Sequence, residues 1–380
     1  MTTHKFAVTL QEKRIQTEAE LRQVVQTQGQ LDGCVIIGID FHAMHFDWES
    51  VSIKDCTFLG CDLSLELEQV LRKKGAFVYS HPDSLPYDPY RANLYTWREL
   101  LEGFSFDQDE SIDYRIYTHF SKTKFRPPIH EALCQRIHDH AIDDALRKLL
   151  DFTEDGMTSR SCVGFMGGHG TLRTDPDYRK TVFTAKLLAE AGYFIVTGGG
   201  PGIMEAANLG AYMAGRTEQE MDLVFELLAK APDFRQKGYH LVAYQILDRF
   251  PEGGESLAIP TWFYGHEPSN LFASYIAKYF SNSIREDTLL AICLYGIVFA
   301  PGSAGTTQEI FQDATQNHYG TMNYYSPMVF LGKQRYELDT LIFPLLRQLS
   351  RGTSYHDLLF ITDEPQEVLR FLQDNPPLKA

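Results

Sequence analysis

"YFIVTGGGPGIMEAANLGA", residues 193–211, carries three signals of one structural unit in order. A short apolar run reaches Thr197, a proline and four glycines fill the next five positions, and a helical pattern begins at Ile203. A buried strand, a tight glycine turn and a helix in this order form a βα unit. The stretch therefore predicts a parallel sheet with helices packed against it.

Strand and helix patterns of the same kind surround this unit. Further short apolar runs lie at 162–166, 240–244, 296–300, 327–331 and 358–362, and helical patterns lie at 178–192, 203–215 and 306–318. Strands that alternate with helices of this length predict an α/β, Rossmann-like fold with a doubly wound parallel sheet. In such sheets a ligand binds at the carboxyl ends of the strands, beside the point where strand order reverses.

The residues before this pattern predict a separate region. We expect an N-terminal accessory α+β region at 1–150 and the Rossmann-like domain at 151–380, because "TEDGMTSRS" resembles a linker. Helical spacing is present at 64–74 and 128–152. Near 45–63 inward residue types recur every five positions, which resembles one coil of a pentapeptide-repeat β-helix. An irregular β-segment packed on another element is the alternative interpretation.

Composition and charge narrow the classes of partner. The chain has 35 Lys and Arg against 50 Asp and Glu, a formal charge of -15, which disfavours duplex nucleic acid. "MTTHKFAVTLQEKRIQ" lacks an apolar run of signal-peptide length, and no stretch approaches the roughly 18–20 apolar residues that span a bilayer. We therefore expect a cytoplasmic protein. Six scattered cysteines and the lack of an HExxH pattern predict no metal site and no cofactor.

Three glycine-bearing turns follow three of the predicted strands. They are "FMGGHGT" (165–171), "TGGGPGIMEA" (197–206) and "PGSAGTTQE" (301–309). Glycines let backbone N–H groups approach an anion, and the next helix adds partial positive charge. One such turn is common in any α/β protein, but three at one sheet edge predict a phosphate-bearing ligand. The candidate binding residues are Gly167, Gly168, Gly198, Gly199, Gly200, Gly202, Gly302, Ser303, Ala304, Gly305, Thr306 and Thr307.

Two glutamates and one arginine are the candidate catalytic residues. Thr306 and Glu309 fit an S/T-x-x-E capping box, and Glu205 lies in a first helical turn where the helix dipole stabilises a carboxylate. The alternative is that both carboxylates line one pocket, as hydrolysis at a sugar carbon requires. Arg285 either pairs with Glu286 or Asp287 at the surface or donates to a phosphate.

"VTGGGPGIMEAANLGA" and "PGSAGTTQE" resemble the paired signatures GGGPGxMEA and PGGxGTxxE of the LOG ("lonely guy") family. The resemblance extends in layout over residues 161–372. It implies a phosphoribohydrolase of purine and pyrimidine metabolism that cleaves nucleoside 5'-monophosphates into free base and ribose 5-phosphate. It also implies catalytic roles for Glu309 and Glu205, phosphate contacts for the 302–306 loop, a contact from Arg285 to phosphate or base, and a homodimer or higher even homo-oligomer.

Three departures from the family pattern motivate a second hypothesis. Glu286 stands where the family's arginine is followed by lysine, Ser303 replaces the second glycine of PGGxGTxxE, and the spacing from Arg285 to Pro301 is one residue longer. A glutamate in place of a lysine changes the local charge by two units. The alternative function is a non-catalytic nucleotide sensor, or a carrier of a phosphorylated cofactor such as a pterin, with the same fold.

Overall fold

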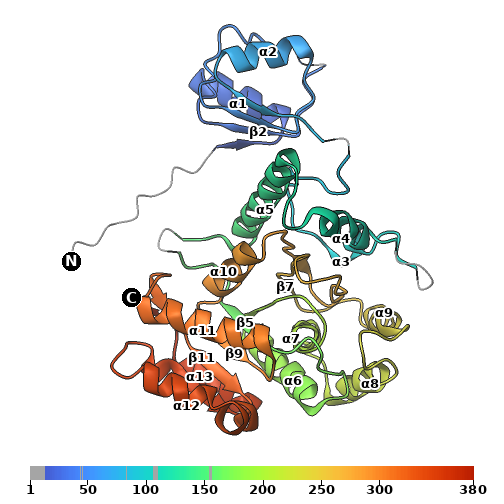
Figure 1. Cartoon of the computed structure of the whole chain (residues 1–380), viewed down its shortest axis with the longest axis vertical. Helices are drawn as coiled ribbons and strands as arrows, with labels where there is room; N and C mark the ends of the chain where they lie inside the picture. The colour runs from blue at the N-terminus through green and yellow to red at the C-terminus, as the bar shows by residue number, and fades with distance from the viewer. Residues whose placement is uncertain (1–12, 43, 45, 83, 106–109, 154–155) are drawn as a thin grey trace. The chain divides into compact units, whose positions relative to one another are not determined.

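The computed structural model describes residues 13–42, 44, 46–82, 84–105, 110–153 and 156–380. The chain forms two compact units, residues 1–91 and 92–380, and Figure 1 traces both. The predicted boundary near residue 150 differs from this division by one long helix and the segment before it. Each unit has its own buried core.

The larger unit is built on a seven-stranded sheet whose strand pairs are all parallel. Its strands are β5 (Cys162–Met166), β6 (Phe194–Thr197), β7 (Ser256–Ala258), β8 (Tyr275–Ile276), β9 (Ile297–Phe299), β11 (Met328–Leu331) and β12 (Leu359–Thr362). Their order is β12-β11-β9-β5-β6-β7-β8, so the chain runs outward from β5 in one direction and then restarts at β9 on its other side. This arrangement confirms the predicted doubly wound, Rossmann-like sheet.

Helices cover both faces of this sheet. The helices are α6 (Pro176–Glu190), α7 (Ile203–Tyr212), α8 (Glu218–Leu228), α9 (Tyr239–Arg249), α10 (Asn282–Ile292), α11 (Ala304–Tyr319), α12 (Ile342–Leu349) and α13 (Pro365–Asp374). Val163, Ile195 and Val298 pack with residues of α6, α7 and α13 in one buried cluster. On the opposite face Gly164 meets Cys293 at the end of α10, and Phe330 contacts Phe343 of α12. Short elements complete the unit: a π-helical turn (Gln334–Asp339), a 3-10 turn (His356–Leu358), β10 (Tyr324–Tyr325) and β13 (Leu378–Lys379).

Five of the six predicted strands are present, and the strand predicted at 240–244 is wrong. That segment lies inside α9, where Tyr239, Val242, Ala243 and Ile246 are buried with helical spacing. β7 and β8 take its place in the sheet. They are three and two residues long, too short to show a pattern of their own.

Residues 92–150 belong to the larger unit because buried polar contacts tie them to it. They form α3 (Trp97–Leu100), α4 (Ile112–Thr123) and α5 (Ile129–Leu150). The Asp139 carboxylate of α5 accepts hydrogen bonds from the backbone N–H groups of Phe280 and Ser281, at 2.9 Å each. Asp143 accepts a hydrogen bond from the Tyr279 hydroxyl. These contacts hold the residues immediately before α10 against α5.

The smaller unit is a four-stranded parallel sheet in sequential order. It contains β1 (Arg14–Ile15), α1 (Glu18–Gln28), β2 (Val35–Ile37), β3 (Thr57–Leu59), α2 (Leu65–Lys73) and β4 (Phe77–Tyr79). Val35 pairs with Thr57, and Thr57 with Phe77, so one coil takes 22 residues and the next takes 20. Gly38 and Gly60 have positive φ at the same point of two coils, just after β2 and β3.

The predicted five-residue pattern at 45–63 covers the end of the first coil, β3 and the start of the second coil, with position 45 outside the described residues. Trp48, Val51, Ile53, Cys56, Phe58 and Cys61 are buried in the core of the smaller unit. Within this segment only β3, residues 57–59, is a strand. Helix α1 lies in the connection from β1 to β2, and helix α2 lies in the connection from β3 to β4. The segment therefore builds one turn of a repeat of about 20 residues rather than a β-helix made of pentapeptides throughout.

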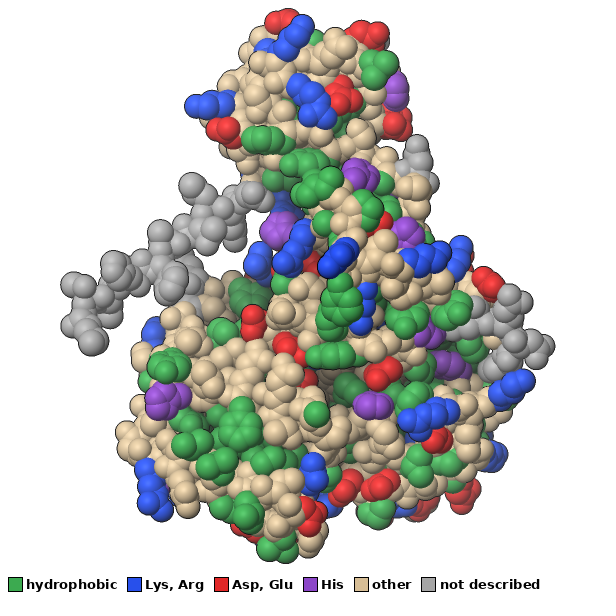
Figure 2. Space-filling model, in the orientation of Figure 1, with side chains coloured by type: hydrophobic (Ala, Val, Ile, Leu, Met, Phe, Trp, Pro, Cys, Tyr) green, Lys and Arg blue, Asp and Glu red, His purple; other side chains and the backbone are tan. Residues whose placement is uncertain are grey.

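Exposed leucines line α12 and the turn before it. Leu338, Leu341, Leu345 and Leu349 recur at three- and four-residue spacing, and each is at least 44% exposed. Figure 2 shows hydrophobic side chains gathered on the surface over α12 and α13. Among the described residues, no helix has the length and apolar character needed to cross a membrane.

Candidate functional site

A cavity of about 660 Å³ opens where the strand order of the large sheet reverses. The loops after β5, β6 and β9 line it, as expected for a ligand site in a doubly wound sheet. Its lining residues include Gly167, Gly168, Gly198, Gly199, Gly200, Ser303, Ala304, Gly305, Thr306, Arg285 and Glu309. A volume of this size lies within the range of small-molecule sites.

The three glycine loops contact one another directly. The Gly168 N–H donates to the Pro301 carbonyl at 3.0 Å, and the Ile203 N–H donates to the Gly168 carbonyl at 3.1 Å. A Cβ on Gly202 would stand 2.3 Å from the Gly168 oxygen, and its φ is +69°. Gly202 is therefore required for packing between loops. Gly202, Gly302 and Thr307 are not among the described residues that line the cavity.

Helix α11 begins three residues earlier than the capping box predicts. Ser303 is its N-cap residue, and no side-chain hydrogen bond caps the first turn among the described residues. Thr306 lies inside the helix, and Glu309 contacts Arg285 instead of reaching back to a cap N–H. The N–H groups of this first turn therefore face the cavity region without a capping side chain, which suits an anion. Ser303 has a negative φ of -110°, so its backbone does not take the left-handed conformation that favours glycine.

Arg285 and Glu309 meet at the wall of the cavity. The Arg285 Nη1 atom is 3.5 Å from Glu309 Oε1, and Arg285 Nη2 donates to Asn282 Oδ1 at 2.8 Å. The Nε atom of Arg285 is buried without a hydrogen-bond partner among the described residues. Burial raises the pKa of Glu309 to about 7, with Glu286 adding to the rise and Arg285 opposing it. Glu309 can therefore change its protonation state near neutral pH.

Glu286 occupies the position beside Arg285 and lies behind the cavity wall. Its carboxylate accepts hydrogen bonds from Gln308 Nε2 at 2.8 Å, from Asn282 Nδ2 at 2.7 Å and from the Tyr264 hydroxyl at 3.4 Å. Its distance to Arg285 Nη2 is 3.9 Å, longer than an N–H···O hydrogen bond. Glu286 is thus held mainly by neutral donors, two of which belong to residues that line the cavity.

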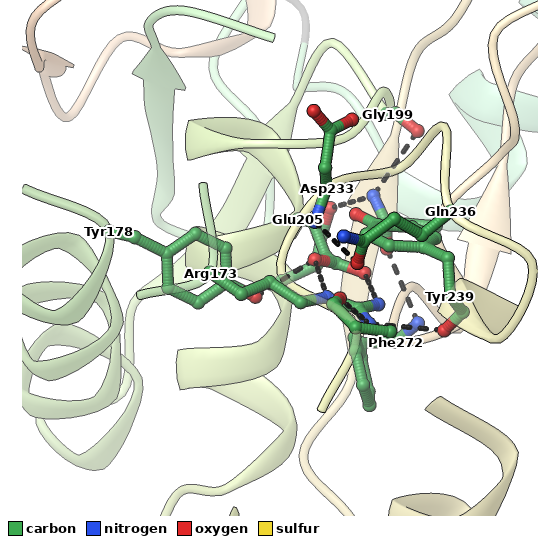
Figure 3. Close-up of polar contacts among 11 residues, drawn as sticks. Arg173, Tyr178, Gly199, Glu205, Asp233, Gln236, Tyr239 and Phe272 are labelled. Carbon is green, nitrogen blue, oxygen red and sulfur yellow. Dashed lines mark hydrogen bonds and ion pairs between the residues drawn. The ribbon is translucent and has the colours of Figure 1, made fainter. Parts of the chain in front are cut away.

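Glu205 is not among the described residues that line the cavity. Figure 3 shows its carboxylate facing Arg173, which contacts Glu205 Oε1 at 2.5 Å and Oε2 at 2.9 Å. The Tyr178 hydroxyl also donates to Glu205, and all three side chains are buried. Burial favours the neutral acid, but the charge and hydrogen bonds of Arg173 keep the Glu205 pKa below its ordinary value. This ion pair joins the first turn of α7 to the loop before α6.

The cavity contains charged residues that the sequence analysis did not single out. Glu267, in the loop after β7, lines the cavity, with Oε2 3.0 Å from where a Cβ on Gly200 would stand. Lys278 also lines it, and its Nζ is 2.8 Å from Asp113 of α4. Glu267 and Lys278 do not lie in a recognisable motif, so no local sequence pattern indicates that they belong to the site. Among the described residues, no three His, Cys, Asp or Glu side chains gather closely enough to hold a metal ion.

Comparison with known proteins finds one matching family model and a set of similar structures. Residues 160–217, which contain the units from β5 to α7, match the SLOG cluster4 family. A molybdenum cofactor binding protein from Rippkaea orientalis is 14% identical, with a TM-score of 0.36 over 57% of this chain and 96% of that one. The Moco carrier protein of Chlamydomonas reinhardtii is 16% identical, with a TM-score of 0.35 over 57% of this chain and 99% of that one. No curated protein matches the chain.

Proposed function

We propose that this protein hydrolyses the N-glycosidic bond of nucleoside 5'-monophosphates to free base and ribose 5-phosphate. The observation that carries the proposal is the Arg285–Glu309 pair beside an uncapped helix start in one cavity. Hydrolysis at C1' of a nucleoside 5'-monophosphate needs an anion site that binds the 5'-phosphate and a carboxylate near C1'.

The 5'-phosphate would bind at the first turn of α11 and the glycine loops. Backbone N–H groups there hold an anion without a flexible side chain, and Arg285 adds a charged donor. The buried Nε of Arg285 supports this role, because a buried donor without a partner is costly unless a ligand completes it. Binding energy from the phosphate then aligns C1' with the carboxylates.

Glu309, in its ionised form, would stabilise the positive charge that develops at C1'. As the C1'–N bond breaks, its electrons pass to the base, which takes up a proton, and a water oxygen bonds to C1'. Glu267 is the second carboxylate of the cavity and would orient this water and accept its proton. Glu205, fully occupied by Arg173 and Tyr178, would act as a positioning residue for α7.

Base release from AMP, GMP, CMP and UMP tests the proposal. Purified protein is incubated with each nucleotide, and free base and ribose 5-phosphate are separated by chromatography. The wild type should release both products in equal amounts, and Glu309→Gln should release neither while binding nucleotide. Binding without release by the wild type would refute hydrolysis and favour the sensor or carrier alternative.

A further inference from the structure

Glu286 connects two residues of the cavity wall that come from distant parts of the chain. Gln308 lies in the first turns of α11 and Tyr264 lies in the loop after β7, and the Glu286 carboxylate contacts both. Glu286 itself is 9% exposed and is not among the described residues that line the cavity. Its side chain therefore acts on a ligand through its neighbours in the cavity wall, and Tyr264 and Gln308 are the two that hydrogen-bond to it.

The contact with Glu286 determines which way the Gln308 amide faces. A carboxylate accepts hydrogen bonds and has none to give, so the amide nitrogen of Gln308 must point toward Glu286. Oε1 is then the amide atom available to meet a ligand in the cavity. One N–H of Gln308 is thus engaged by Glu286, and the Oε1 acceptor lies at the other end of the amide, where it can meet a ligand.

The same carboxylate also holds an aromatic ring at the cavity wall. The Tyr264 hydroxyl donates to Glu286 and accepts from Asn282 Nδ2 at 3.0 Å, which fixes the distal end of the side chain. The ring lines the cavity and the residue remains 62% exposed. An exposed aromatic face next to a fixed hydrogen-bond acceptor is the combination that binds a nucleobase, by stacking and by a contact to the base edge.

We propose that Glu286 is a positioning residue for a base subsite formed by Tyr264 and Gln308, and that this subsite selects bases with an amino group at the recognised edge. The proposal rests on the nucleotide ligand of the proposed function. The Gln308 carbonyl accepts from an exocyclic amino group, as in adenine or cytosine, whereas the oxo group of hypoxanthine or uracil places an acceptor against an acceptor. AMP should therefore be preferred to IMP, and CMP to UMP.

Equilibrium binding to the Glu309→Gln variant tests this selection independently of turnover. AMP has an amino group at C6 and an unprotonated N1, whereas IMP has an oxo group at C6 and an N1–H, so the ratio of their Kd values measures how the subsite recognises this edge of the base. We expect AMP to bind about tenfold more tightly than IMP. AMP forms a hydrogen bond to Gln308 Oε1, whereas IMP leaves this acceptor unpaired. Equal Kd values for the two nucleotides, or no measurable binding of either, would overturn the inference.

Three further substitutions, each combined with Glu309→Gln, assign the effect to Glu286. Glu286→Gln allows the Gln308 amide to turn and should reduce the AMP:IMP ratio to within about twofold of one. Gln308→Leu, at an exposed site, should also reduce the AMP:IMP ratio, without risk to folding. Tyr264→Leu should weaken the binding of AMP and of IMP equally.

Glu226→Gln is the matched control, because this exposed glutamate of α8 lies away from the cavity, and it should leave the AMP:IMP ratio unchanged. An unchanged ratio in both Glu286→Gln and Gln308→Leu would refute the positioning role, whereas absent base release by the wild type would refute only hydrolysis.

Discussion

The Nη1 atom of Arg285 lies 3.5 Å from Oε1 of Glu309, and the two residues come from α10 and α11. The carboxylate keeps a pKa of about 7 beside this cation because burial outweighs the attraction. The pair therefore joins a permanent positive charge to a group that titrates at neutral pH. Its consequences can be measured in both activity and stability.

Activity should rise with pH through the range in which Glu309 ionises. If Glu309 has the proposed catalytic role, its ionised carboxylate is the active form, and kcat/KM should increase about tenfold per pH unit below pH 7 and level off above it. The pH profile of base release from AMP measures this. Glu309→Asp should keep a rising profile at a lower rate. A profile that falls across pH 6 to 8 would show that the protonated acid is the active form.

Glu309→Gln should make the folded protein more stable at pH 8. Between pH 4.5 and 7 the folded chain holds a proton that the unfolded chain releases, so wild-type stability falls as pH rises through this window. A glutamine at this position does not titrate, so the variant's free energy of unfolding should exceed that of the wild type by about 3 kcal/mol above pH 7. Denaturant unfolding at pH 8 and at pH 4.5 measures it, and the difference should vanish at the lower pH. A variant less stable than the wild type at pH 8 would contradict the prediction.

Two glycines of the β9 loop should respond oppositely to alanine. A Cβ on Gly302 would stand 2.1 Å from Thr306 Oγ1 and 3.0 Å from the Gly168 nitrogen, whereas Gly305 has open space around it. Gly302→Ala should therefore destabilise the fold by about 1–3 kcal/mol through overpacking. Gly305→Ala lies in a helix and should fold at least as stably as the wild type.

The Gly305→Ala variant then separates binding from folding. Gly305 lines the cavity, so its new methyl group should obstruct a phosphate that approaches the backbone N–H groups. We expect a raised Kd for AMP with unchanged stability, measured by calorimetry and thermal unfolding. Unaltered nucleotide affinity would place the phosphate elsewhere in the cavity.

The sequence predicted the sheet and the three loops well because both depend on local patterns. β5, β6 and β9 are short apolar runs followed by glycine turns, and these turns meet as expected. The roles of Glu205 and Glu267 depend instead on contacts between distant residues. Arg173, 32 positions from Glu205, occupies its carboxylate, and Glu267 approaches Gly200 across a loop without a motif. The contacts of Glu286 with Tyr264 and Gln308 are equally nonlocal. The sequence therefore shows that Glu286 departs from the LOG family pattern, but it does not show which residues Glu286 contacts.

Removing one partner of the Arg173–Glu205 pair should cost more stability than removing both. Glu205→Gln leaves a buried guanidinium without its counter-charge, and the expected loss is about 3–5 kcal/mol. The double variant Arg173→Met with Glu205→Gln removes both charges and should recover part of that loss. Denaturant unfolding of the single and double variants gives the coupling free energy. Additive losses would show that the two side chains do not act as a pair.

We expect copies of this chain to contact one another through the exposed leucines of α12 and of the turn before it. Leu341, Leu345 and Leu349 form an apolar stripe on the surface, and such stripes commonly mark interfaces between protein chains. Sedimentation of the wild type should show a homodimer or a higher even oligomer. Leu345→Glu should shift the chain toward the monomer at micromolar concentration, because a buried unpaired charge opposes association. Leu65→Glu, at a leucine that is 76% exposed in the smaller unit, is the matched control and should leave the sedimentation profile unchanged. A wild type that sediments as a monomer, or a Leu345→Glu variant that remains fully associated, would rule out this contact.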